Sequence, residues 1–308
     1  MKRGEIGHYE TIQIGGESIR AFVPHPLPPN PPIVLEAPLQ QTLEATELAL
    51  ANLNQAFKSS ADQKSLRDHL VRQESIASSQ IEGIYVSLDD LRRYDAGKRP
   101  KAQLDDVIEV ANCIAALEHG LSRMEDGFPL SNRLIREAHA ILMSGKRGIS
   151  KQPGEFRTSQ NWIGGTRPGN AHFVPPPPHA VPDCMTALEQ FIHTEGDGIP
   201  TLVLAALTHL QFETIHPFLD GNGRIGRSLI IFQLSQEGVI RSPLSTYFKQ
   251  HQSSYYSLLS HVRQTGDWEA WLQFFFEGVK ASAEVALMTC SNPPEVAVPT
   301  PESGEQNE

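Results

Sequence analysis

Most of this 308-residue chain repeats one pattern, in which apolar residues recur every three or four positions along segments of several helical turns. This spacing places the apolar residues on one face of an α-helix, so each segment can bury that face against its neighbours. The pattern predicts helices over residues 42–82, 104–120, 132–143, 182–193, 200–214, 227–236, 253–264 and 268–285. We therefore expect a mainly α-helical fold.

Two regions break the helical pattern. Residues 155–175 contain two short extended segments around the turn sequence GGTRPGN, which predicts a β-hairpin. Residues 1–40 include the proline-rich run FVPHPLPPNPPIV and are expected to form an extended arm, because proline fixes φ. We accordingly divide the chain into this arm, an N-terminal helical region (41–100), a core carrying the hairpin (101–285) and a tail with the composition of a disordered segment (286–308).

Composition and charge exclude several classes of protein. The net charge of −10 and the pI near 5.6 argue against a nucleic-acid binder that uses a broad basic surface. Cys113, Cys184 and Cys290 are widely spaced and form no CxxC pair, which disfavours a disulfide framework or a zinc site. The N-terminus lacks the apolar segment of a secretory signal, and the longest apolar run, near residues 202–210, is too short to span a bilayer. We expect a soluble, cytoplasmic protein with no membrane or nucleic-acid partner.

One short stretch, HPFLDGNGRIGR at residues 216–227, concentrates residues that can do chemistry. Pro217 is expected to end the preceding helix, which leaves His216 at the mouth of a loop, where an imidazole suits a general base. Asp220 lies directly before the glycines, where a carboxylate could hold Mg²⁺ on a phosphate. Taken singly, His216 could bond a carbonyl at a helix end, and Asp220 could cap the next helix.

The second half of this stretch is typical of an anion site. Gly221, Asn222 and Gly223 directly precede a helix, where free backbone N–H groups and the positive end of the helix dipole favour an anion. Arg224 and Arg227 are three residues apart and share one face of the first turn. Two cations at a helix N-terminus are unfavourable unless an anion such as a polyphosphate compensates. The whole stretch therefore predicts a base, a metal ligand and a phosphate cradle.

The stretch resembles the signature of the Fic family, HPFx(D/E)GNGRxxR, and meets every fixed position of it. The segments GEFRTSQNWIGG and AHFVPPPP are similar to the flap hairpin of that family, and the resemblance covers roughly residues 60–285. It implies a Fic-type helical core with one β-hairpin flap. It also implies transfer of AMP from ATP to a Tyr, Thr or Ser hydroxyl of a target protein, which can be the protein itself, with release of pyrophosphate.

The resemblance implies a role for each residue of the stretch. His216 deprotonates the incoming hydroxyl, and Asp220 holds the Mg²⁺ that bridges the α- and β-phosphates. Gly221, Asn222 and Gly223 form the anion cradle. Arg224 contacts the phosphates, and Arg227 takes the γ-phosphate. These roles agree with the reading from the residues themselves, because positioning and charge neutralisation dominate phosphoryl-type chemistry.

Two further sites are expected on the same grounds. The flap would bind the target segment by strand addition through Thr158, Ile163, His172 and Val174, although a surface β-ribbon without a ligand would have the same sequence. Tyr255 could offer an aromatic face to adenine, but an ordinary core tyrosine explains it equally well.

A second motif, SSQIEG at residues 78–83, resembles the inhibitory helix of the family, (S/T)xxxE(G/N). Ser78 and Glu82 are four residues apart and share one helix face, and Gly83 lets the chain turn away at once. Read alone, Glu82 would be a solvated helix residue. With the stretch nearby, we expect a bidentate pair between Glu82 and Arg227, which would occupy the place of the γ-phosphate.

Several alternatives stay open at this point. The same scaffold could transfer phosphate, UMP or phosphocholine, although the intact glycine cradle favours AMP. Glu82 could instead orient a water that removes AMP from a modified target. A regulatory module that binds ATP with little turnover belongs to a different class. The oligomeric state, a homodimer included, is not fixed by these residues.

Overall fold

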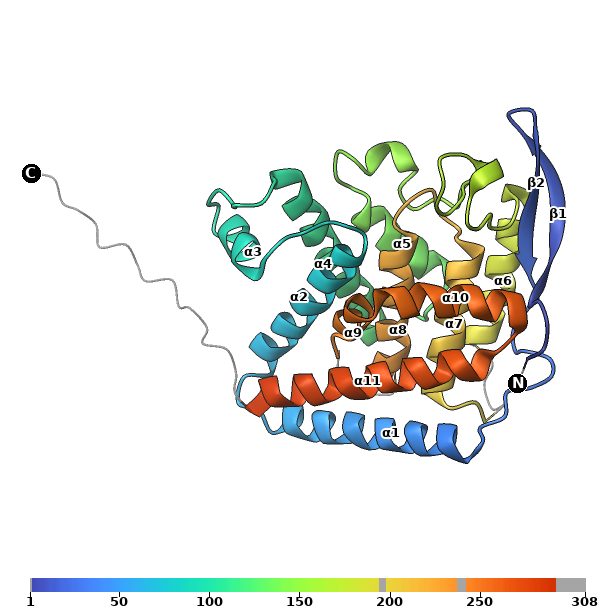
Figure 1. The fold of residues 1–308 in the computed structure, drawn as a ribbon. Coiled ribbons are helices and arrows are strands. Elements are labelled where there is room, and N and C mark those ends of the chain that lie inside the picture. Colours follow the sequence, from blue (N-terminus) through green and yellow to red (C-terminus); the bar gives the residue numbers. More distant parts are fainter. Residues whose placement is uncertain (1, 194–197, 237–241, 292–308) are drawn as a thin grey trace, which may run out of the picture.

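The computed structural model describes residues 2–193, 198–236 and 242–291. Over these residues the chain forms eleven α-helices and one two-stranded antiparallel sheet, so the predicted mainly α-helical fold is confirmed. The pair of strands lies at one end of the helical body and the short helix α3 at the other (Figure 1). Within the part of the chain that the structure describes, no helix is both long and apolar enough to cross a membrane.

Most of the segments predicted to be helical correspond to helices in the structure. In chain order they are α1 (Ala37–Lys58), α2 (Gln63–Ile81), α3 (Leu88–Asp95), α4 (Leu104–Glu125), α5 (Asn132–Leu142), α6 (Val181–Ile192), α7 (Thr201–Ile215), α8 (Asn222–Gln236), α9 (Leu244–Gln250), α10 (Gln252–Thr265) and α11 (Trp268–Ser291). The segment at 42–82 is divided because the Asp62 carboxylate accepts a hydrogen bond from the Ser65 N–H and starts α2. Helix α11 continues past the expected start of the tail, and residues 292–308 lie outside the described residues.

Two short helices were not predicted from the spacing of apolar residues. Helix α3 is too short for several apolar repeats, and it begins at a capping box in which Ser87 and Asp90 bond each other's backbone. Helix α9 has only seven residues and follows Pro243. Both helices matter for the site, because α9 packs on α2 and α3 packs between α2 and α4.

The hairpin of strands is not where the sequence analysis placed it. Strands β1 (Gly7–Ile14) and β2 (Glu17–Pro24) pair in the segment expected to be an extended arm, joined by two glycines with positive φ. Residues 155–175 contain only one isolated bridge, Ile163 with Phe173. The prolines explain the difference, since Pro168 opens a 3₁₀ turn and prolines cannot donate to a ladder.

The core is centred on α7 and α8. Nearly every side chain of both helices is buried, polar ones included, and α7 packs along α8. Helices α1 and α11 run side by side along one face of the body (Figure 1). Helix α2 contacts α4, α8 and α9, which brings its C-terminal end against the N-terminal turn of α8. This contact joins the two motifs of the sequence analysis.

Candidate active site

The loop between α7 and α8 is held in one shape by its own residues. His216 ends α7 in the left-handed region (φ 50°), and its N–H donates to the Phe212 carbonyl at 2.8 Å. Gly221 has a φ of 75°, which glycine adopts without strain. Asn222 Oδ1 accepts from the Phe218 N–H and Asn222 Nδ2 donates to the Phe218 carbonyl, both at 2.8 Å. The Asn222 side chain is thus committed to the loop, and only its backbone is left for the predicted anion cradle.

His139, a buried histidine outside the motif, stacks on the loop and hydrogen-bonds to it. The His139 ring stacks on Phe218 with 3.6 Å between ring centroids. His139 Nδ1 accepts from the Gly154 N–H at 2.9 Å, so Nε2 carries the hydrogen and donates to the Asp220 carbonyl at 3.1 Å. Burial lowers the pKa of His139 to about 4, which keeps the ring neutral. The sequence analysis missed this residue, whose only signal was a histidine on an apolar helix face.

Arg157 supports the same loop from the flap side. Its buried guanidinium donates from Nε to the His216 carbonyl at 2.9 Å and from Nη2 to the Pro176 carbonyl at 2.6 Å. Its backbone N–H donates to the Pro217 carbonyl at 2.9 Å. Burial lowers the pKa of Arg157 to about 10, and the side chain stays cationic at neutral pH. Arg157 therefore joins the flap to the backbone of the predicted base, a role that the sequence analysis did not assign.

His216 is in the protonation state that a general base requires. Its side chain is 19% exposed. Burial, together with the cations of Arg157 and Arg263, lowers the pKa of His216 to about 3. The imidazole is therefore neutral at pH 7 and can accept a proton. The nearest carboxylate is Glu213, whose Oε2 lies 3.9 Å from His216 Nδ1.

The carboxylate of Asp220 is exposed at the edge of the site. Its side chain is 49% exposed, and its Oδ1 accepts from the Gly221 N–H at 2.6 Å. Arg224 Nη2 lies 3.8 Å from the same oxygen. Mg²⁺ prefers carboxylate oxygens and is commonly held by one or two of them together with substrate phosphates. The donor set fits such an ion, and no cluster of three or more acidic, histidine or cysteine ligands occurs among the residues that the structure describes.

Arg224 reaches the site with its side chain already oriented. Its side chain is 5% exposed, and Nη1 lies 3.3 Å from Glu109 Oε2 on α4. Glu109 also pairs with Arg147 at 2.9 Å, so the carboxylate is shared by two cations. Glu109 was not predicted, because only the fold brings α4 beside the N-terminus of α8.

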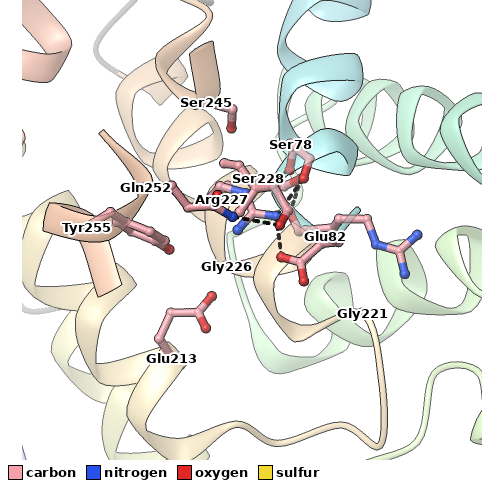
Figure 2. Close-up of polar contacts among 12 residues, drawn as sticks. Ser78, Glu82, Glu213, Gly221, Gly226, Arg227, Ser228, Ser245, Gln252 and Tyr255 are labelled. Carbon is pink, nitrogen blue, oxygen red and sulfur yellow. Dashed lines mark hydrogen bonds and ion pairs between the residues drawn. The ribbon is translucent and has the colours of Figure 1, made fainter. Parts of the chain in front are cut away.

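Arg227 and the inhibitory motif meet directly. Arg227 Nη2 lies 2.8 Å from Glu82 Oε1, and the same guanidinium donates to Ser78 Oγ at 2.8 Å and to the Ser78 carbonyl at 2.9 Å (Figure 2). The expected ion pair is present, but Glu82 makes one contact with the guanidinium where a bidentate pair was expected. Burial opposes the charge of Arg227, but Glu82, Tyr255 and Glu213 together outweigh it and raise the pKa of Arg227. Ser78, Glu82 and Arg227 therefore form one connected unit.

Gly223 makes room for this unit at the start of α8. A Cβ at Gly223 would lie 2.3 Å from Glu82 Oε1, closer than real Cβ contacts allow. The predicted cradle is thus the place where the Glu82 carboxylate lies, against the N-terminal turn of a helix. A carboxylate is itself an anion, which is what this turn was expected to hold.

Tyr255 does not have the surroundings predicted for it. It is 1% exposed, and its ring packs on Phe248 with 4.7 Å between centroids. His209 Nδ1 donates to the Gly226 carbonyl at 2.8 Å, so its Nε2 accepts from the Tyr255 hydroxyl at 2.9 Å. Tyr255 is a core residue whose ring is covered, and the assignment to adenine does not fit it. The neighbouring Tyr256 is 44% exposed.

The predicted flap residues divide into two groups. Thr158 and His172 are exposed, and Ile163 forms the bridge with Phe173. Val174 is 8% exposed, and its carbonyl accepts from the Phe22 N–H of β2 at 2.9 Å. Val174 is therefore used inside the chain and is not free to pair with a target. The N-terminal hairpin contacts the flap through this hydrogen bond, and the sequence analysis did not predict this contact.

Comparison with known families matches this architecture in two parts. Residues 129–234 match the model of the Fic/DOC family, and residues 40–122 match the model of the Fic/DOC family N-terminal region. The first range contains the loop with His216, and the second contains the helix with Glu82. Both motifs that meet at Arg227 therefore fall inside matched regions.

Individual relatives are similar at modest identity. A probable protein adenylyltransferase of Aquifex aeolicus is 28% identical over 175 residues, which are 56% of this chain and 50% of that protein. The protein adenylyltransferase Fic of Drosophila willistoni is 31% identical over 193 residues, 62% of this chain and 36% of that protein. This chain thus matches half or less of the length of those relatives. The crystal structure of a Fic family protein from Desulfovibrio desulfuricans has a TM-score of 0.63 at 25% identity, covering 80% of this chain and 74% of the other.

Proposed function

The chain belongs to the Fic/DOC family, and on that basis we propose that it is a protein adenylyltransferase restrained by Glu82. In this proposal it transfers AMP from ATP to a Tyr, Thr or Ser hydroxyl of a target protein or of itself. The observation that carries the proposal is the convergence of a neutral His216, an exposed Asp220 and a buried Arg227 at the N-terminal end of α8. The two relatives described above are named as protein adenylyltransferases, one of them as a probable one, which supports the same reaction.

The chemical step needs one base and an in-line attack. His216 Nε2 accepts the proton of the target hydroxyl while the hydroxyl oxygen bonds the α-phosphorus of ATP. The bond between the α-phosphorus and the oxygen bridging to the β-phosphate breaks, and pyrophosphate leaves. Because Arg157 holds the His216 carbonyl and His139 holds the Asp220 carbonyl, the loop keeps the base in place during this step.

Charge neutralisation is supplied by the start of α8. Its backbone N–H groups and its dipole favour the phosphates, and Arg224 and Arg227 add two cations on the same face. Asp220 would hold Mg²⁺, which neutralises phosphate charge when bound. Glu109 keeps Arg224 oriented toward this region. Positioning and electrostatics together are what phosphoryl-type transfer requires.

Glu82 restrains the reaction by competing for Arg227. Its carboxylate lies against the position of Gly223 and is paired with Arg227, where a terminal phosphate would otherwise bind. Both are anions that seek the same cation, so ATP in its productive position requires Glu82 to leave. The Glu82 side chain is 36% exposed, which leaves it free to move outward.

Intact mass measurement tests the reaction. Wild type, Glu82→Gly and Glu82→Gly/His216→Ala are incubated with Mg²⁺-ATP and a lysate fraction, and proteins that gain mass are identified. A gain equal to AMP on the chain or on a target, present in Glu82→Gly and absent in the double variant, supports the proposal. A gain equal to phosphate supports a phosphotransferase instead. Tight ATP binding without any gain supports a regulatory module.

Removal of AMP is the competing use of Glu82. A purified AMP-modified target is incubated with wild type and with Glu82→Gly. Loss of the AMP mass with wild type alone would assign Glu82 to hydrolysis, because the carboxylate would then be needed to orient water. Retention of the modification with both proteins leaves restraint of transfer as its role.

A further inference from the structure

Glu213 is a buried acid with an unused oxygen. It lies on α7, one turn before His216, and is 7% exposed. Its Oε1 has no hydrogen-bond partner among the described residues. A buried carboxylate oxygen without a donor is costly, and such groups in native structures call for an explanation. Neither the family motif nor the loop geometry described above uses this residue.

The position of Glu213 points to His216. His216 ends α7 with a left-handed backbone, and this turn leaves its Nδ1 3.9 Å from Oε2 of Glu213, one turn earlier on the helix. Within the described part of the chain, His216 Nδ1 is also buried without a hydrogen-bond partner. Nδ1 therefore lies just beyond hydrogen-bond distance from Oε2 of this carboxylate, whereas the unpartnered Oε1 lies on the side of Gly226. A small shift of either side chain would join Nδ1 to Oε2.

Room for the carboxylate is provided by α8. A Cβ at Gly226 would lie 2.4 Å from Glu213 Oε1, so no larger residue fits at that position without displacing the acid. Figure 2 shows Glu213 beside Gly226, with its carboxylate directed toward α8. The first glycine after the cradle, Gly226, thus has a steric reason that concerns Glu213 and not the phosphates.

The charges around Glu213 come from three other elements. Arg227 on α8 and Arg263 on α10 favour its ionised form, and Glu82 on α2 opposes it. Tyr255, also on α10, faces the acid with its buried ring. Burial is the largest influence and raises the pKa of Glu213 to about 7, so the acid changes charge in the physiological range.

The charges around His216 mostly oppose its protonation. Arg157 from the flap and Arg263 from α10 disfavour an imidazolium, whereas the main chain of Glu213 and the Asp220 carboxylate in the loop favour one. A base in this setting needs a nearby acid to stabilise the charge that it gains. Among the described residues, Glu213 supplies the carboxylate oxygen that lies nearest to the ring.

We propose that Glu213 is a positioning residue for His216: its carboxylate faces Nδ1, fixes the hydrogen there and leaves Nε2 free to act as the base. The inference rests on the proposed function, because it gives His216 the role of base. During transfer, the target hydroxyl proton moves to Nε2, the hydroxyl oxygen bonds phosphorus and pyrophosphate leaves. Glu213 stays ionised and takes up no proton in this step, and its negative charge stabilises the imidazolium, as a third group orients the base in other nucleophile–base pairs.

Kinetics in the released enzyme test the proposal first. Glu82→Gly/Glu213→Gln is compared with Glu82→Gly, and Glu82→Gly/Glu189→Gln serves as the control, because Glu189 on α6 contacts Asn132 and not the site. We expect kcat to fall at least about tenfold with Glu213→Gln while the Kd for ATP stays within about twofold. Removal of Glu82 lowers the pKa of Glu213 below its wild-type value of about 7, because Glu82 helps to raise it. We expect kcat of Glu82→Gly to fall as the pH drops through this lowered pKa, and this fall to disappear in the double variant, since it reports the protonation of Glu213.

A second measurement reads the pair without any turnover. In wild-type protein labelled with ¹⁵N-histidine, the signals of His216 are assigned by their loss in His216→Ala. They should shift with an inflection near pH 7 as the neighbouring Glu213 titrates, and this inflection should vanish in Glu213→Gln and remain in Glu189→Gln. Thermal unfolding shows that each variant is folded.

Three results would overturn the inference. The first is kcat within about twofold of the parent. The second is a loss of ATP affinity as large as the loss of kcat, which would make Glu213 part of the nucleotide site. The third is a His216 inflection that survives Glu213→Gln. If Glu82→Gly transfers no AMP, the proposed function fails, and the ¹⁵N titration still decides whether Glu213 and His216 are coupled.

Discussion

Arg227 Nη2 and Glu82 Oε1 lie 2.8 Å apart, although the two residues are separated by 145 positions in the chain. The contact joins the C-terminal end of α2 to the first turn of α8. Arg227 is 2% exposed on its side chain and Glu82 is 36% exposed, so the cation is fixed and the anion is the partner able to leave. In the proposed function, the position of this one glutamate decides whether Arg227 is free for a phosphate.

Ser78→Ala should loosen this unit without removing its ion pair. The Ser78 hydroxyl accepts from Arg227 Nε at 2.8 Å, and its loss leaves a buried N–H of a cation without that acceptor. We expect the free energy of unfolding to fall by about 1–3 kcal/mol, and AMP transfer to rise above wild type but to stay below Glu82→Gly. Denaturant unfolding and labelled-ATP assays measure both. Ser79→Ala is the control, and equal transfer by Ser78→Ala and wild type would contradict the account.

Arg157→Lys should damage catalysis through the loop. The guanidinium bonds the carbonyls of His216 and Pro176, and a lysine has neither the planar fork nor the reach to bond both. We expect a loss of stability of about 2–4 kcal/mol and a fall in kcat of about tenfold or more in the Glu82→Gly background. Arg136→Lys, which alters a part-exposed bond to the Gly154 carbonyl, is the control. Unchanged kcat in Arg157→Lys would show that the loop does not depend on this contact.

Tyr255→Phe should affect the fold and not the nucleotide. The hydroxyl is the donor to His209 Nε2, and its removal leaves a buried acceptor unpaired. We expect the free energy of unfolding to fall by about 1–3 kcal/mol while the Kd for ATP changes less than about twofold. Tyr256→Phe, on the exposed neighbour, should change stability by no more than about 0.5 kcal/mol. A large loss of ATP affinity in Tyr255→Phe would restore the original assignment to adenine.

Glu213 should make stability depend on pH in a direction unusual for an acid. Burial raises its pKa in the folded protein to about 7, above the ordinary value of 4.5, so the neutral acid is favoured by folding. This contribution is fully present below pH 4.5 and is lost as the pH rises through 7. Relative to wild type, Glu213→Gln should therefore gain stability between pH 5 and pH 8. Denaturant unfolding of both proteins at pH 5 and pH 8 measures this difference. A Glu213→Gln protein that loses stability relative to wild type between these two values would contradict it.

The sequence was most informative where one residue type carries one local signal. Helical periodicity identified the long helices, and the segment predicted at 132–143 matches α5 to within one residue. The stretch from His216 to Arg227 identified the residues of the loop between α7 and α8. Three glycines, a carboxylate and two arginines seldom occur together in so short a segment that has only a structural role. The pair of Glu82 with Arg227 followed from two motifs taken together.

The rest depended on contacts between segments that are distant in the chain. His139, Arg157 and Glu109 hold the site from α5, the flap and α4, and nothing in their local sequence shows which loop or helix they meet. Tyr255 was misassigned because a tyrosine on a helix has the same pattern whether its ring is covered or open. The hairpin was misplaced because proline content was weighed above the glycine pair at the turn of β1 and β2.

If Glu82 restrains transfer of AMP, as proposed, its removal should raise the rate of incorporation. Initial rates of AMP incorporation from labelled Mg²⁺-ATP are measured for wild type, Glu82→Gly and Gln80→Gly. The last variant places the same helix-weakening residue near the end of α2 but retains the ion pair. The account predicts a rate at least about tenfold above wild type for Glu82→Gly and a rate near wild type for Gln80→Gly. A Glu82→Gly protein no faster than wild type would contradict it.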